Sequence, residues 1–236
     1  MKPLIHALFL YGLVTSLLPA QTNINKGISS DKQLRFEVAK ELRQTEKYQL
    51  IVAQRFFAKG VSLERAKTKK LEALEAFKAA MSEFEKFLTL YERSEAAPYA
   101  QIMWSHCLIS QRKQYTAIRD GYQSVIDYWP ESPEAALAAY LIGKTYKDIG
   151  EIKNAIKAFD KVREVYPQKH ESVLALWEIL KISKLHQDEK LRLKILKELT
   201  FEIKRTKAND SYLVNAAKEL AGIYFNQGDG PKGLEA

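Results

Sequence analysis

The chain has 236 residues, of which 46% are apolar and 28% charged, and its formal net charge is +8. This composition is that of an ordinary globular protein, and it excludes a disordered chain, a collagen and a polytopic membrane protein. Ten Gly and seven Pro are few for an all-β sandwich with frequent turns. The single cysteine, Cys107, excludes an internal disulfide framework and a cysteine-rich zinc site.

The first twenty residues have the three-segment layout of a secretory signal. Lys2 supplies a positive charge, an apolar run extends from Leu4 to Leu18, and polar residues begin at Gln21. The run has about 15 residues and falls short of the ~20 that a membrane-spanning helix needs. We therefore expect a signal peptide over 1–20, cut after Ala20, and a linker over 21–31. Since no cysteine follows the cut, no lipid anchor is expected, and the predicted location is the periplasm, with outer-membrane association left open.

Apolar residues recur at helical spacing from residue 32 onward, and no segment alternates with the period of a strand. The pattern predicts an N-terminal helical hairpin over 32–95, which we interpret as a degenerate repeat. Its first helix is expected to include the apolar stripes at Leu34, Val38, Leu42 and at Tyr48, Val52, Phe56, and to stop at Lys59-Gly60. Ser62 is expected to cap a second helix that ends near Leu88.

In the rest of the chain, the spacing of apolar residues predicts further helices. The connections between them have only a few residues, which makes neighbouring helices antiparallel. These helices are expected near 97–112, 115–129, 133–149, 152–166, 171–186, 188–206 and 211–227.

The chain also repeats itself. Ala80-x3-Phe84 recurs as Ile118-x3-Tyr122 and as Ala155-x3-Phe159, at offsets of 38 and 37 residues. Pro130 and Pro167 mark the same helix end in two successive units. A fixed period in this range indicates a stacked array of helix pairs.

The clearest unit spans about 136–167 and carries Ile142-Gly143-x2-Tyr146, then Ala155-x3-Phe159, then Pro167. It resembles the tetratricopeptide repeat, whose pattern is Leu-Gly-x2-Tyr, Ala-x3-Phe and a terminal Pro. Gly143 and Ala155 are expected to let the two helices of a pair approach closely. The resemblance implies an all-α fold, a right-handed superhelix of stacked antiparallel helix pairs, with repeats over 96–236 and the last one incomplete.

The period is longer than the usual 34 residues of this family. Long units with Tyr-Pro junctions, together with an export signal, are similar to two exported bacterial groups. One is the periplasmic repeat protein that works with the Tol-Pal envelope system, and the other is the repeat lipoprotein of the outer-membrane assembly machine.

The first helices of the pairs are expected to line a concave groove that holds an extended peptide. Aromatic side chains beside lysines can bind such a peptide and its carboxylates. An alternative left open is that Tyr140 and Trp177 pack between repeats. The predicted partner-binding residues, taken at the repeat offset, are Tyr99, Ile102, His106, Tyr140, Lys144, Lys147, Trp177, Lys181 and Lys184.

The sequence has no phosphate-binding glycine loop, nucleophile elbow or metal-binding motif, so we expect no enzymatic activity, no cofactor and no metal. Cys107 is predicted to be a small buried thiol. The basic run over 190–207 is predicted to be a solvated face, with anionic lipid head groups or acidic partners as the second interpretation.

The expected function is a non-catalytic scaffold of the bacterial cell envelope that binds a protein or peptide partner, with acidic partners among the candidates, and no nucleic acid. Two alternatives remain open at this point. The chain is the N-terminal repeat region of a larger envelope enzyme or accessory protein, or it is a structural envelope protein that self-assembles into a homo-oligomer through 32–95.

Overall fold

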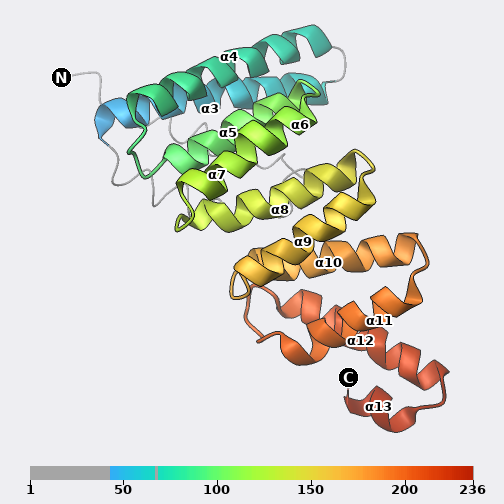
Figure 1. Ribbon diagram of the computed structural model, residues 1–236. Helices are drawn as coiled ribbons and strands as arrows, with labels where there is room; N and C mark the ends of the chain where they lie inside the picture. Colours follow the sequence, from blue (N-terminus) through green and yellow to red (C-terminus); the bar gives the residue numbers. More distant parts are fainter. Residues whose placement is uncertain (1–42, 67–68, 236) are drawn as a thin grey trace. The chain divides into compact units, whose positions relative to one another are not determined.

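The computed structural model describes residues 43–66 and 69–235, and every regular element over these residues is a helix (Figure 1). The prediction of an all-α fold built from adjacent helix pairs is thereby confirmed. The predicted signal peptide, the linker and the beginning of the predicted N-terminal helix, 32–42, lie outside the described residues. The chain divides into two compact units, Met1–Ser132 and Pro133–Ala236, called unit 1 and unit 2 below.

Unit 1 begins with a hairpin of two long helices, α3 (Gln44–Arg65) and α4 (Lys70–Leu90), which lie side by side (Figure 1). The predicted stop at Gly60 is wrong, because α3 continues through it and Ser62 lies inside the helix. A Cβ at Gly60 would lie 2.8 Å from the ring of Phe77. The glycine therefore serves the close approach of α4, and this contact offsets its low helix propensity.

The core of unit 1 is built on three phenylalanines of α4. Phe77, Phe84 and Phe87 are buried, and α3 and α5 (Ala97–Ser110) cover them with apolar side chains. The other side chains of this core come from α3, α4, α5 and the residue before α5, and include Leu50, Ala53, Phe57, Ala73, Ala80, Ala96, Tyr99, Ala100, Met103 and Cys107.

The helix that pairs with α5 contains a π-helical turn. It runs as α6 (Gln114–Thr116), η1 (Ala117–Tyr122) and α7 (Gln123–Tyr128), where the sequence predicted one regular helix over 115–129. Gly121 lies in η1, and a Cβ there would overlap the Ser105 hydroxyl. Gln101 donates a hydrogen bond of 3.0 Å to the Asp120 carbonyl. The widened turn is thus held against α5 by both contacts.

Unit 2 consists of successive helix pairs, and most of their limits agree closely with the predicted ones, but the helix predicted over 188–206 already ends at Glu202. Its helices are α8 (Pro133–Asp148), α9 (Ile152–Val165), α10 (His170–Leu185), α11 (Glu189–Lys197) with the π-helical η2 (Glu198–Glu202), α12 (Asp210–Asn226) and α13 (Gly230–Glu235). We call α8, α10 and α12 the A helices, because each is the first helix of its pair.

The α8–α9 pair is held by the contact that the repeat pattern predicts. A Cβ at Gly143 would lie 2.6 Å from the ring of Phe159, so the glycine lets this ring lie against α8. Ala155, Phe159 and Val162 are fully buried on the inner side of α9. The expected close approach through Gly143 and Ala155 is present.

In the stretches of the chain that the structure describes, no helix combines the length and apolar character required to cross a membrane.

Candidate protein-binding face

Each A helix of unit 2 contributes one aromatic side chain to the candidate face: Tyr140 from α8, Trp177 from α10 and Tyr212 from α12. Trp177 of α10 meets Tyr212 of α12 edge to face, with ring centroids 5.3 Å apart. His170, at the start of α10, lies 6.2 Å from the same tyrosine ring. Tyr140 of α8 packs on Phe159, with centroids 5.7 Å apart. Two of the aromatic residues predicted for the groove, Tyr140 and Trp177, therefore lie on A helices of unit 2, and Tyr212 is an additional aromatic residue there.

The two predicted aromatics of this unit differ in exposure. Tyr140 is buried, with 6% of its surface exposed, whereas Trp177 is half-buried. Burial raises the pKa of Tyr140, and the nearby charge of Glu178 raises it further. Tyr140 is in a packing environment, and Trp177 presents some of its indole to solvent.

Glu178 lies between two of the predicted lysines. Lys181 donates a hydrogen bond of 2.7 Å to one carboxylate oxygen of Glu178, and Lys147 of α8 pairs with the other. Only 9% of the Glu178 side chain is exposed. Burial would raise its pKa, but the hydrogen bonds from Lys147 and Lys181 outweigh burial and hold the pKa below its usual value. Glu178 is therefore an ionised carboxylate that links α8 to α10.

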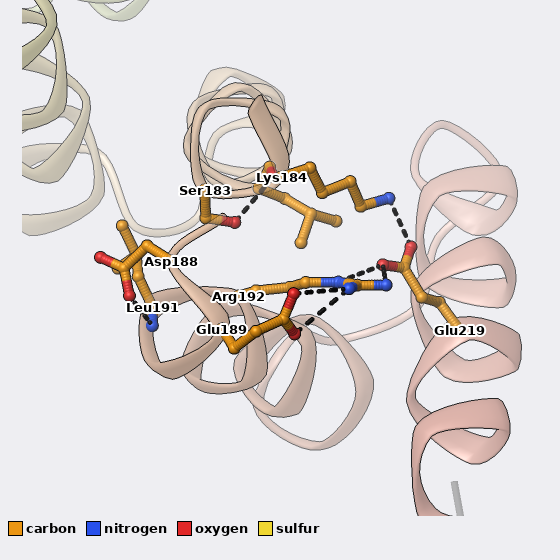
Figure 2. Close-up of polar contacts among 8 residues, drawn as sticks. Ser183, Lys184, Asp188, Glu189, Leu191, Arg192 and Glu219 are labelled. Carbon is orange, nitrogen blue, oxygen red and sulfur yellow. Dashed lines mark hydrogen bonds and ion pairs between the residues drawn. The ribbon is translucent and has the colours of Figure 1, made fainter. Parts of the chain in front are cut away.

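Glu219 has the same role in the next helix pair along the chain. Figure 2 shows it reaching from α12 to Lys184 of α10 and Arg192 of α11. The Lys184 ammonium is 2.5 Å and the Arg192 guanidinium 2.8 Å from its oxygens. Arg192 also pairs with Glu189 at 3.0 Å, and Asp188 caps α11 by accepting a hydrogen bond from the Leu191 amide (Figure 2).

All four predicted lysines of unit 2 thus have a carboxylate partner within the protein, since Lys144 pairs with Asp148 at 2.9 Å. Sequence reasoning found the lysines and missed Glu178 and Glu219. Some of the signal was present, because Glu178 and Lys181 stand three residues apart on one helix. The pairs between helices span 31 and 35 residues and required the packed structure.

The three predicted residues of unit 1 lie on α5 and are buried. Tyr99 accepts a hydrogen bond of 3.2 Å from Gln54 of α3, and His106 is 2.9 Å from the Tyr122 hydroxyl. Ile102 is 3% exposed. These side chains help to pack unit 1, and a contact between them and a partner stays a prediction.

Within the described residues, no group of three or more His, Cys, Asp or Glu side chains is arranged to hold a metal ion. Cys107 is fully buried, and burial raises the pKa of its thiol far above the usual value. A thiol in this environment stays protonated and is a weak nucleophile. Its surroundings are those of a core side chain.

The fold and this face define a class: antiparallel helix pairs packed in succession, with the A helices presenting aromatic and charged side chains. Comparison with protein families identifies the repeat. The tetratricopeptide repeat family model matches residues 137–169, which form the α8–α9 pair and its connection to α10. This stretch is therefore similar to a tetratricopeptide repeat, and stacked repeats of this kind present extended surfaces that suit contacts with other proteins. No curated protein matches the chain, and the resemblance to the two envelope groups has no support beyond the repeat itself.

Proposed function

We propose that the protein is a non-catalytic scaffold of the bacterial cell envelope that binds a protein or peptide partner on its A helices. The observation that carries this proposal is the tetratricopeptide repeat at 137–169. We define the A-helix face as Tyr140, Lys144, Lys147, Trp177, Lys181, Lys184 and Tyr212.

Trp177 is the anchor of the proposed face. Its indole is half-buried and rests edge-on against Tyr212, so a partner would meet a rigid, partly apolar surface. Tryptophan side chains in such positions often dominate the binding free energy of an interface. Their few rotatable bonds also keep the entropic cost of binding low.

The paired lysines keep the capacity to bind an acidic partner. An ammonium group has three donors, and one bond to Glu178 or Glu219 leaves two of them. The side chains of Lys181 and Lys184 are 53% and 40% exposed, so these donors reach solvent. The proposed partner is therefore an extended segment that combines an apolar side chain for Trp177 with a carboxylate for Lys181 or Lys184.

The envelope location rests on the signal-like layout of residues 1–20. Cell fractionation followed by intact-mass measurement tests it. Mature protein that begins near Gln21 in the periplasmic fraction is the expected result, and uncut protein in the cytoplasm would contradict it.

Two substitutions test the face, and quantitative capture from envelope extract is the measurement. Trp177→Ala should reduce the captured partner at least about tenfold, in line with a central aromatic anchor. Lys181→Gln should weaken capture while leaving stability within about 1 kcal/mol, because the Lys181 side chain is 53% exposed and Lys147 still pairs with Glu178. The double variant Lys153→Gln/Lys157→Gln is the control, because both lysines are exposed on α9, outside the A helices.

Thermal unfolding of each variant distinguishes binding from packing. If Trp177 mainly packs between helices, Trp177→Ala should cost about 3–5 kcal/mol of folding free energy. Capture that is unchanged in both Trp177→Ala and Lys181→Gln would show that the A-helix face is not the binding surface.

A further inference from the structure

We propose that α11, η2 and the loop to α12 form a docking surface for an anionic lipid bilayer, separate from the A-helix face. We call this surface the basic ridge. It consists of Lys190, Lys194, Lys197, Phe201, Lys204 and Lys207, all exposed.

The helical portion of the ridge lies on one side of α11 and η2. Lys190, Lys194 and Lys197 follow at intervals of four and three residues, which puts them on one helix face, and Phe201 comes four residues later. Ile195, Leu196 and Leu199 are buried on the opposite side and attach the segment to unit 2. The lysines of the ridge therefore face solvent on a helix whose other side is packed into unit 2.

The loop portion is held in place by Asn209, which is 5% exposed. Its amide nitrogen donates a hydrogen bond of 3.0 Å to the Lys204 carbonyl, and its amide oxygen accepts one of 2.7 Å from the Thr206 backbone N–H. Arg205 is fixed by its ion pair with Asp210. These contacts preorganise the backbone that carries Lys204 and Lys207.

The charges of the ridge differ from those of the A-helix face. Within the described residues, Lys190, Lys194, Lys204 and Lys207 form no ion pair, whereas all four predicted lysines of the A-helix face do. Residues 190–207 hold seven Lys or Arg and two Glu, and Glu198 is already paired with Arg163. Lys197 lies over the Tyr224 ring, 6.0 Å from its centroid, whereas the charges of Lys190, Lys194, Lys204 and Lys207 are not taken up by an ion pair within the described residues.

Phe201 indicates the kind of partner. Its side chain is 53% exposed in the middle of the lysines. Lysines that attract anionic head groups, together with an aromatic ring that enters the interface, are the usual chemistry of peripheral membrane binding. A single-stranded nucleic acid would instead favour a series of aromatic side chains for successive bases, and the ridge has one.

Vesicle binding by the full chain tests the charges. Vesicles of phosphatidylcholine alone are compared with vesicles that also contain phosphatidylglycerol. The variant Lys190→Gln/Lys194→Gln/Lys204→Gln/Lys207→Gln should bind the anionic vesicles at least about 100-fold more weakly than the unmodified chain, because each lysine near such a surface contributes about fivefold. The apolar N-terminal segment is the same in all variants, so its contribution cancels.

The matched control removes the same charge elsewhere in unit 2. Lys153→Gln/Lys157→Gln/Lys161→Gln/Lys169→Gln changes four exposed lysines, three on α9 and one directly before α10, which have no ion pair among the described residues. This control should bind within a few fold of the unmodified chain. Circular dichroism confirms that both variants are folded.

A local probe reports on the ridge itself. Phe201→Trp should become quenched by brominated lipid in anionic vesicles, relative to the unmodified chain. Phe225→Trp is the control, since Phe225 is 50% exposed in the same unit but lies outside the ridge, and it should show no added quenching.

Three results would overturn the proposal: equal weakening in the two quadruple variants, binding that does not depend on phosphatidylglycerol, or absence of quenching at position 201. Tighter binding of single-stranded DNA than of anionic vesicles at equal phosphate concentration would also overturn it and assign the ridge to nucleic acid.

Discussion

Gly143 and Gly60 make the same contact in different units. Each lies on the first helix of a pair beneath a phenylalanine ring of the second, Phe159 for Gly143 and Phe77 for Gly60. The sequence predicted the role of Gly143 because a repeat pattern surrounds it. No repeat pattern surrounds Gly60, and a glycine that follows a lysine is typical of a helix end. A glycine inside a helix that allows close packing gives the same local sequence. Only the contact with Phe77 distinguishes the two.

This contact predicts that Gly143→Leu destabilises unit 2. The new side chain would have to displace the Phe159 ring, and overpacking of this kind costs about 1–3 kcal/mol. Gly222→Ala is the control, because Gly222 is also helical and a Cβ there meets nothing within 4 Å. That change should be neutral or stabilise by up to about 1 kcal/mol. Urea unfolding measures both, and equal stability of the two variants would contradict the contact.

Cys107 provides a second prediction at the residue scale. Because the thiol is fully buried and its pKa is raised, a thiol reagent should not label the native protein at neutral pH. Labelling should occur at the rate at which unit 1 opens, and it should become fast in denaturant. Rapid labelling under native conditions would show that α5 is not packed as described.

At the scale of elements, helix existence and helix limits were largely predictable, whereas the links between helices were not. The helical spacing of apolar residues and the short connections located most helices of unit 2 within a few residues. The π-helical turns η1 and η2 were missed, because their sequences fit a regular helix. The carboxylates that pair with the predicted lysines were missed as well, since Glu178 and Glu219 meet lysines of the preceding A helix only after the pairs have packed.

The Glu178 contacts predict a pH dependence of stability. Its folded pKa is lowered, so its stabilising contribution is present above the unfolded pKa of about 4.3 and is lost as the pH falls through the folded pKa. Glu178→Gln should cost about 1–3 kcal/mol at pH 7 and should show a smaller loss of stability on acidification. Chemical unfolding as a function of pH measures this.

The control for this experiment is Glu164→Gln, since Glu164 is exposed on α9 and forms no ion pair within the described chain. It should leave the pH profile unchanged. A Glu178→Gln profile that coincides with the control would mean that Lys147 and Lys181 do not stabilise the folded carboxylate.

At the scale of the whole molecule, the division into two units predicts that residues 133–236 fold alone. Unit 2 contains its own buried side chains, among them Phe159, Leu180, Leu196 and Leu220. A compact unit with its own core can fold independently. The isolated fragment should show helical circular dichroism and a cooperative thermal transition. A featureless transition would show that unit 2 needs the rest of the chain.

The functional partner is the property of the whole molecule that the sequence predicts least. Repeat spacing depends on packing within the chain and is therefore recorded in its apolar pattern. Recognition depends on side chains that reach solvent, such as the half-buried Trp177 and the exposed Phe201, and their spacing follows no period that identifies a ligand. The structure adds one distinction between the candidate binding surfaces: the lysines of the A-helix face form ion pairs within the protein, whereas most lysines of the basic ridge do not.

The two ion pairs of Glu219 should affect how unit 2 responds to a pulling force. One carboxylate of α12 holds cations from both α10 and α11, so a tensile load applied to the C-terminal end would be carried to some extent by these two ion pairs. Repeat arrays can unravel one unit at a time from an end. Because salt screens exposed charges, the force needed to peel α12 away should fall as ionic strength rises. The α12–α13 segment would then act as an extensible element whose stiffness depends on its ionic surroundings.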